Sequence, residues 1–167
     1  MLAALILGYR DIRIDRRGVI VLPLLAGVIM VAWDASMEAI WSTLDRAWIW
    51  RDGGSWFGVP LSNFFGWYLT AYLFYLAFAW YLGKNATSSL RLPASYFRAA
   101  IVCYGICGFG NLLIYRHGLF PVSAMDATGR IWMTRDILVA STLVSVFGMG
   151  SLAVLAWMRC RAGVAQG

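Results

Sequence analysis

Four long apolar runs separated by short polar segments limit what this 167-residue chain can fold into. We place them at residues 18–42, 64–82, 99–115 and 137–158. A helix needs about 20 apolar residues to cross roughly 30 Å of hydrocarbon. With 61% hydrophobic and only 13% charged residues, the chain has too little polar surface to coat a soluble globule. The sequence therefore predicts an all-α integral membrane protein, a polytopic helical bundle forming a single domain over residues 1–167.

The chain begins with a shorter apolar segment, residues 1–9, which is about half the length of a membrane span. Either this segment lies in the membrane interface or the chain is a piece of something longer. The polar linker 10–17, RDIRIDRR, separates it from the first long run.

The net charge of +6 comes mainly from arginines grouped between the apolar runs. Lys and Arg number nine in segments 10–17, 84–98 and 159–167, against five in segments 43–56 and 116–135. The positive-inside rule therefore predicts a cytoplasmic C-terminus, with loop 43–56 on the opposite side. We expect no nucleic-acid binding, because no basic face interleaved with polar helix or sheet is present.

The loop between the first two long runs is unusually aromatic: residues 48–67 read WIWRDGGSWFGVPLSNFFGW. Six of the nine tryptophans gather here and just upstream, namely Trp33, Trp41, Trp48, Trp50, Trp56 and Trp67. An aromatic belt at the membrane interface is the ordinary explanation for tryptophans in such proteins, and it suits Trp80 and Trp157. It explains this cluster less well, because the cluster surrounds acidic residues.

Three carboxylates share one predicted helix face beside this loop. At 100° per residue, Asp34, Glu38, Trp41 and Asp45 fall within an arc of about 60°. An acid within a membrane span normally faces a cavity or a partner, which favours a functional site. The alternative is that Glu38 and Asp45 lie beyond the membrane boundary in solvent; we expect this for Asp45.

A carboxyl group in apolar surroundings stays protonated near neutral pH, whereas a better-solvated neighbour ionises, and together they form a general acid beside a general base. Indole faces nearby are suited to stabilising a carbocation. We expect no metal site, since the only histidine, His117, has no partner ligands at metal-binding spacing. Cys103, Cys107 and Cys160 lie in or at the ends of apolar runs without an accompanying base.

One stretch also resembles a known family. The residues Trp33-Asp34-x3-Glu38, then Trp48-x-Trp50, then Gly53 to Trp67, GGSWFGVPLSNFFGW, are similar to the signature of the carotenoid biosynthesis membrane proteins, which include bisanhydrobacterioruberin hydratase and carotenoid 1,2-hydratases. The resemblance implies addition of water to the terminal C=C of an acyclic carotenoid, without a cofactor, in a bacterial or archaeal cell membrane. Family members look longer, and this chain resembles their C-terminal part.

The residues and the resemblance suggest one hypothesis. Asp34 or Glu38 would be the acid, the other would orient water, and Asn63 would hold that water. The expected substrate-contacting residues are Trp33, Trp41, Trp48, Trp50, Trp56, Phe57, Pro60 and Trp67. The lipophilic carotenoid would enter from membrane lipid between the helices.

Two other functions stay open at this point. The same loop would serve as a partner surface in a non-catalytic membrane subunit or a lipid- or isoprenoid-binding protein. A transporter is less favoured, because the spans hold few polar groups midway. A homo-oligomer and a missing N-terminal half are both open.

Overall fold

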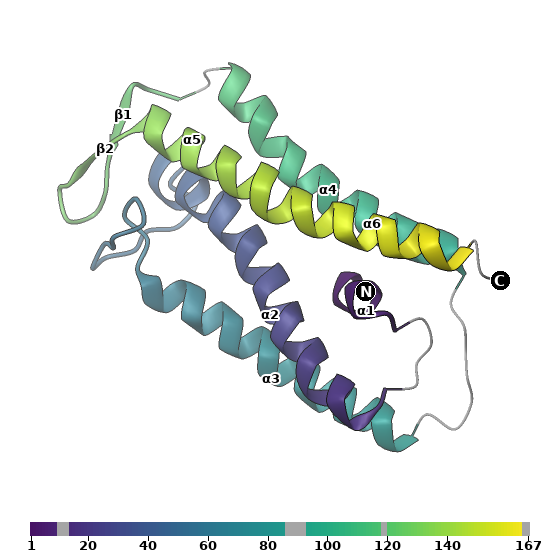
Figure 1. Ribbon diagram of the computed structural model, residues 1–167. Coiled ribbons are helices and arrows are strands. Elements are labelled where there is room, and N and C mark those ends of the chain that lie inside the picture. Colours follow the sequence, from purple (N-terminus) through teal and green to yellow (C-terminus); the bar gives the residue numbers. More distant parts are fainter. Residues whose placement is uncertain (10–13, 86–92, 118–119, 165–167) are drawn as a thin grey trace.

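The computed structural model describes residues 1–9, 14–85, 93–117 and 120–164. Over these ranges the chain is built mainly from long helices (Figure 1). They are α2 (Arg16–Ala39), continued by the π-helix η1 (Ile40–Leu44); α3 (Leu61–Asn85); α4 (Ala94–His117); and α5 (Thr134–Leu143), η2 (Val144–Gly150) and α6 (Ser151–Val164), which run on as one rod. The short helix α1 (Leu2–Leu7) precedes them.

The predicted apolar runs lie inside these helices, which extend beyond them into polar residues. At the start of α2, for example, the Asp15 side chain accepts a hydrogen bond from the Gly18 amide at 2.8 Å and caps the helix. Among the described helices, three segments are long and apolar enough to cross a membrane: Arg16–Leu44, Ala94–Ile114 and Thr134–Ala162. The tyrosines and tryptophans of α3 lower its mean hydropathy, so its crossing stays a prediction.

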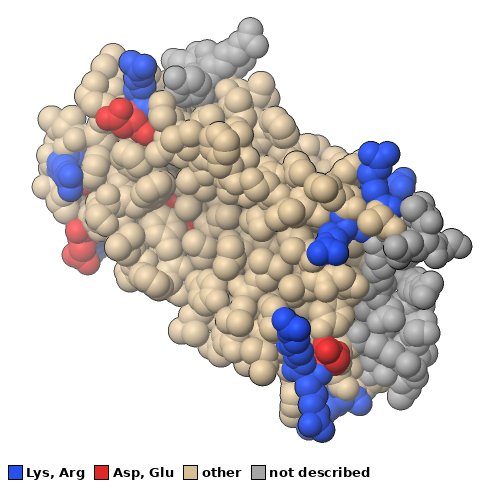
Figure 2. All heavy atoms as spheres, in the orientation of Figure 1, with Lys and Arg blue, Asp and Glu red and all other residues tan. Residues whose placement is uncertain are grey.

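Charge is distributed as a membrane would require. Figure 2 shows Lys, Arg, Asp and Glu gathered towards two ends of the visible face, with a broad uncharged region between them. Many large apolar side chains are exposed along the helices, including Phe74 and Trp80 on α3 and Ile106 and Phe109 on α4. An exposed apolar surface of this extent is expected to face lipid.

The helices α2 and α3 pack closely side by side. At their contact, a Cβ added to Gly27 would lie 2.8 Å from the Tyr68 ring, so only glycine fits there. Most of α3 is exposed or half-buried, and Ala79 is the one buried residue among the described positions of this helix. This pairing holds the start of α3 against the second half of α2.

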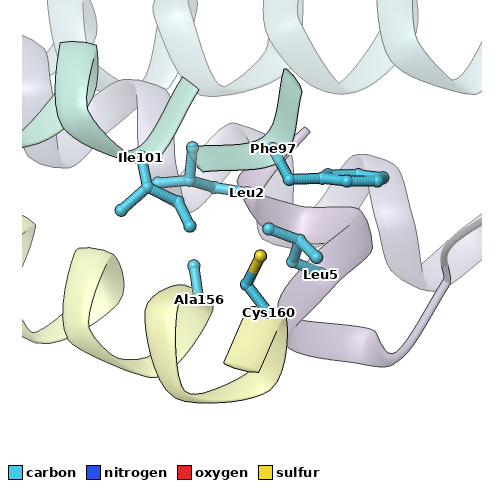
Figure 3. Packing of buried hydrophobic residues seen from close by; sticks show 6 residues of the cluster. All are labelled: Leu2, Leu5, Phe97, Ile101, Ala156 and Cys160. Carbon is cyan, nitrogen blue, oxygen red and sulfur yellow. The ribbon is translucent and has the colours of Figure 1, made fainter. Parts of the chain in front are cut away.

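The N-terminal helix α1 packs between α4 and α6 (Figure 3). Leu2 and Leu5 meet Phe97 and Ile101 of α4, together with Ala156 and Cys160 of α6. Helix α1 of segment 1–9 therefore packs within the helical bundle. The sequence alone had left open a position of this segment in the membrane interface. Residues 10–13 of the predicted linker and residues 86–92 of segment 84–98 lie outside the described residues.

The polar segment 116–135, predicted only as a loop, contains a hairpin. Strand β1 (Ser123–Met125) pairs antiparallel with β2 (Ile131–Met133), with Ala124 opposite Trp132. The Asp126 carboxylate closes the turn by accepting from the Thr128 and Arg130 amides at 2.9 and 3.1 Å. In Figure 1 this hairpin lies at the same end of the molecule as the loop between α2 and α3.

Candidate functional site

The centre of the site is a pair of buried carboxyl groups on α2. Asp34 is 2% exposed and Glu38 is 3% exposed. Four residues apart on a helix, they project from the same face, one turn above the other. The two side chains are therefore neighbours, and both are shielded from solvent. We refer to Asp34 and Glu38 as the carboxyl pair.

The first turn of α3 supplies the partner of Asp34. The Asn63 side-chain amide donates a hydrogen bond from Nδ2 to Asp34 Oδ2 at 2.9 Å. The Asn63 position is set by the helix start, where its own backbone amide donates to the Pro60 carbonyl at 3.0 Å. The close packing of α2 on α3 therefore brings together the two carboxyls and the amide that the sequence singled out.

The aromatic loop supplies the partners of Glu38. Trp48 and Trp50 each donate their indole N–H to Glu38 Oε1, at 2.6 and 2.7 Å. Trp48 also stacks on Trp41, with ring centroids 6.3 Å apart. Both donors converge on one oxygen, so Glu38 Oε1 is held in place by two residues of the aromatic loop.

The shared helix face predicted for the acids ends at Glu38. Trp41 is 46% exposed and Asp45 is exposed. After Ala39 the α-helix gives way to the π-helix η1, whose wider turn changes the spacing of the side chains that follow Glu38. Ser42 marks the change, since its hydroxyl donates to the Glu38 carbonyl at 2.8 Å. Asp45 therefore lies in solvent, away from the carboxyl pair.

A tight turn shapes the rest of the loop. Trp56 and Val59 exchange backbone hydrogen bonds at 3.2 and 2.9 Å around Phe57 and Gly58. Both central residues have positive φ, 51° and 90°, as in a type I′ turn. Phe57 is a bulky residue in this left-handed region, a position that costs energy and often marks a functional site. Its carbonyl accepts from the Thr43 hydroxyl at 2.6 Å, which ties the turn to η1.

The hairpin covers this turn. Trp132 donates its indole N–H to Asp126 Oδ2 at 2.8 Å and packs edge-on against Phe57. A Cβ added to Gly53 would lie 2.8 Å from Thr128, and one added to Gly58 would lie 3.0 Å from Asp126 Cβ. Partial desolvation raises the pKa of Asp126, but hydrogen bonds from Thr128 and Trp132 outweigh it and leave that pKa below its ordinary value.

Two cavities are lined by residues that neighbour the carboxyl pair. The larger, about 650 Å³, is an apolar space between α1, α2, α3 and α4. We call it the lateral groove; its walls include Leu22, Met30, Trp33, Ala71, Phe78, Ala79 and Tyr104. The smaller, about 290 Å³, lies between η1, the aromatic loop and the hairpin. We call it the polar pocket; its walls include Ser42, Thr43, Arg46, Trp50, Gly58 and Asp126.

The remaining predicted contact residues are divided among these features. Trp33 lines the lateral groove and Trp50 lines the polar pocket. Trp56 packs edge-on against Phe57 and Phe64, and its buried indole N–H has no hydrogen-bond partner among the described residues. Pro60 holds the start of α3, whereas Trp67 is 42% exposed on α3.

Sequence reasoning missed two polar groups that position the site. The Asn111 amide donates to the Ser36 carbonyl and to Ser145 Oγ at 3.0 and 2.9 Å. It thereby links α4 to α2 and η2; an amide inside an apolar run was the available signal. Asp126 gave no signal, because its role depends on the hairpin.

Comparison with known proteins gives one match. The family model described as carotenoid biosynthesis protein matches residues 1–131, which include the carboxyl pair, Asn63, the aromatic loop and Asp126. No curated protein and no solved structure matches the chain. Among the described residues, no group of three or more His, Cys, Asp or Glu side chains is arranged to hold a metal ion.

Proposed function

The chain belongs to the family of carotenoid biosynthesis proteins, and from that premise we propose that its carboxyl pair hydrates the terminal C=C of an acyclic carotenoid end group. The family and the membrane-spanning helices indicate a lipophilic isoprenoid substrate within the membrane. The observation that carries the finer proposal is the buried pair of carboxyl groups, one held by an amide and the other by two indoles.

In this proposal Glu38 is the base, supported by the two indole N–H groups that donate to its Oε1 and would stabilise negative charge there. Asp34, which accepts from the Asn63 amide, is the acid. This arrangement meets the first need of the reaction, a proton donor beside a proton acceptor with bulk water excluded.

The proposed reaction balances without a cofactor. Asp34 transfers its proton to the less substituted alkene carbon, forming a C–H bond and a tertiary carbocation. The oxygen of one water molecule bonds to the cation, and Glu38 takes the proton that this water releases. The proton then passes from Glu38 back to Asp34, its neighbour one helical turn away. The products are a tertiary alcohol and the enzyme in its starting state, and the indole faces of the loop would stabilise the cation.

The lateral groove is suited to the polyene chain. On α2 its walls run from Leu22 to Trp33, which is about 17 Å at the helix rise of 1.5 Å per residue. Trp33 directly precedes Asp34. An end group that reaches Trp33 from the groove would therefore come close to the proposed acid, while the remainder of the molecule stays among apolar side chains.

The experiment is pigment chromatography of a lycopene-producing host that expresses the chain. Asp34→Asn and Glu38→Gln keep side-chain shape and remove the ionisable group, so each should lower hydroxylated product by about 10²- to 10⁴-fold. Asp45→Asn is the matched control, because Asp45 is exposed and should be dispensable. Full product in all three variants would overturn the acid–base assignment. Bound but unconverted carotenoid in the parent would favour a binding protein or a non-catalytic subunit.

A further inference from the structure

The polar pocket adjoins the carboxyl pair through a single side chain. Trp50 forms part of its wall and also donates its indole N–H to Glu38 Oε1 at 2.7 Å. Ser42, another wall residue, donates to the Glu38 backbone carbonyl. Trp50 and Ser42 therefore each contact both the pocket and Glu38.

The walls of this pocket suit water. They carry the hydroxyls of Ser42 and Thr43, the Arg46 guanidinium and the Asp126 carboxylate. Arg46 Nη2 donates to the Met125 carbonyl at 3.3 Å, so it spans from the end of η1 to the hairpin. A pocket of about 290 Å³ has room for several water molecules, each of which occupies about 30 Å³ in the liquid.

The lateral groove suits water less well, because its walls are mainly apolar. Hydration consumes one water molecule for each turnover, yet both carboxyls are nearly inaccessible. Trp50 contacts both the pocket and Glu38, and it belongs to a loop, so it can shift without unwinding α2.

We propose that the polar pocket is the water entrance to the carboxyl pair and that Trp50 is its gate; this inference rests on the proposed function. With Trp50 in place, Glu38 is held by the indole N–H and screened from solvent. When the indole moves aside, a water molecule passes from the pocket towards Glu38. Trp50 is thus a positioning residue, which acts on the reaction through Glu38.

Cysteine labelling tests this without any turnover. In protein whose Cys103, Cys107 and Cys160 are replaced by alanine, a charged thiol reagent is applied to nanodiscs that expose both membrane faces. Ser42→Cys places a thiol in the pocket wall and should react readily. Ser36→Cys is the matched control: Ser36 is 1% exposed on the same helix and does not line the pocket, so it should stay unmodified. Equal reactivity at both positions would overturn the proposal.

A second comparison identifies the gate. Glu38→Cys should react slowly, and adding Trp50→Ala should speed the reaction by about tenfold, the ratio expected when one packed aromatic contact no longer holds the closed state. Trp48→Ala is the matched control, since Trp48 donates to the same oxygen but does not line the pocket. Faster labelling with Trp48→Ala and none with Trp50→Ala would place the entrance elsewhere and refute the gate.

Blocking the pocket links access to chemistry. Ala127 is an exposed wall residue, and Ala127→Trp should slow labelling of Ser42→Cys and lower the hydration rate while leaving bound carotenoid unchanged. Val122→Trp adds bulk to the same hairpin region at a position that is 79% exposed and outside the pocket wall. An unchanged hydration rate in Ala127→Trp would refute the water entrance. If the unsubstituted protein makes no alcohol, the proposed hydration is refuted. Cysteine labelling then still decides whether the pocket opens onto position 38.

Discussion

The lateral groove and the polar pocket differ in the chemistry of their walls. The groove lies between α1, α2, α3 and α4, is mainly apolar and includes Trp33, the residue before Asp34. The pocket is formed by a π-helix, a loop and a hairpin, carries an arginine and an aspartate, and includes Trp50, which donates to Glu38 Oε1. In the proposed reaction, this difference would let the hydrocarbon and the water approach the carboxyl pair through separate cavities.

Filling the groove should have the largest effect on this comparison. Ala79 is 4% exposed and lines the groove, so Ala79→Trp should lower carotenoid binding by about ten- to a hundredfold through overpacking. Ala71→Trp, at another wall position, should act similarly. The measurement is pigment absorbance per mole of purified protein in an Asp34→Asn background, which removes turnover.

Ala77→Trp is the control for that experiment. It introduces the same side chain on the same helix at an exposed position outside the groove wall. Equal pigment in the Ala79 and Ala77 variants would show that the carotenoid binds elsewhere.

Removing the Asn63 amide should separate binding from chemistry. Asn63→Leu leaves the buried Asp34 Oδ2 without its donor, a loss of about 1–3 kcal/mol, and should slow hydration by about tenfold while bound carotenoid stays constant. Product per bound pigment is the quantity to follow. Asn85→Leu, at the exposed far end of α3, is the control. If Asn63→Leu instead lost pigment as Ala79→Trp does, the amide would belong to the groove.

Disturbing the turn should affect only the pocket side. Gly58→Ala forces alanine to a φ of 90° and brings its Cβ to 3.1 Å from Thr43 Oγ1, so a loss of about 1–2 kcal/mol in stability is expected. Thermal unfolding in detergent, followed by tryptophan fluorescence, measures this loss, and labelling of Ser42→Cys should slow as well. Gly66→Ala, which meets nothing within 4 Å, should be neutral. Loss of groove binding in Gly58→Ala would show that the two regions are not independent.

The smallest expected effect is a pH dependence confined to the hairpin. Because the pKa of Asp126 is lowered on folding, the stability that its carboxylate contributes is fully present above the ordinary pKa of 3.8. That stability is lost as pH falls below this value through the pKa of the folded state. The Trp132 indole N–H resonance should therefore shift only in acidic solution below that pH. Asp126→Asn should remove the step. A step of equal size in the variant would assign it to another group.

Much of this arrangement was predictable from the sequence. The apolar runs indicated the helices because their length and composition leave few alternatives in a membrane. Asp34, Glu38 and Asn63 stood out because polar groups in apolar surroundings are costly. The unusual aromatic content of residues 48–67 likewise marked the loop around them.

Other features depended on contacts that no local pattern encodes. The helical wheel placed Trp41 and Asp45 with the acids, but the π-helix at Ile40–Leu44 separates them, and that irregularity is stabilised by the contact of Thr43 with the distant Phe57 carbonyl. The wheel also gave no reason for both Trp48 and Trp50 to bind one oxygen of Glu38. Their convergence requires the loop to fold back on α2.

What the sequence alone determined is the membrane environment, the helices and the acidic residues on α2, because hydrophobicity and the cost of buried charge act on each segment separately. Only the tertiary structure decided which groups surround those acids. The lateral groove exists because α1 to α4 leave space between them. The polar pocket exists because a hairpin about 70 residues further along the chain covers the turn at Gly58. Such juxtapositions depend on the packing of distant segments, which residue periodicity does not specify.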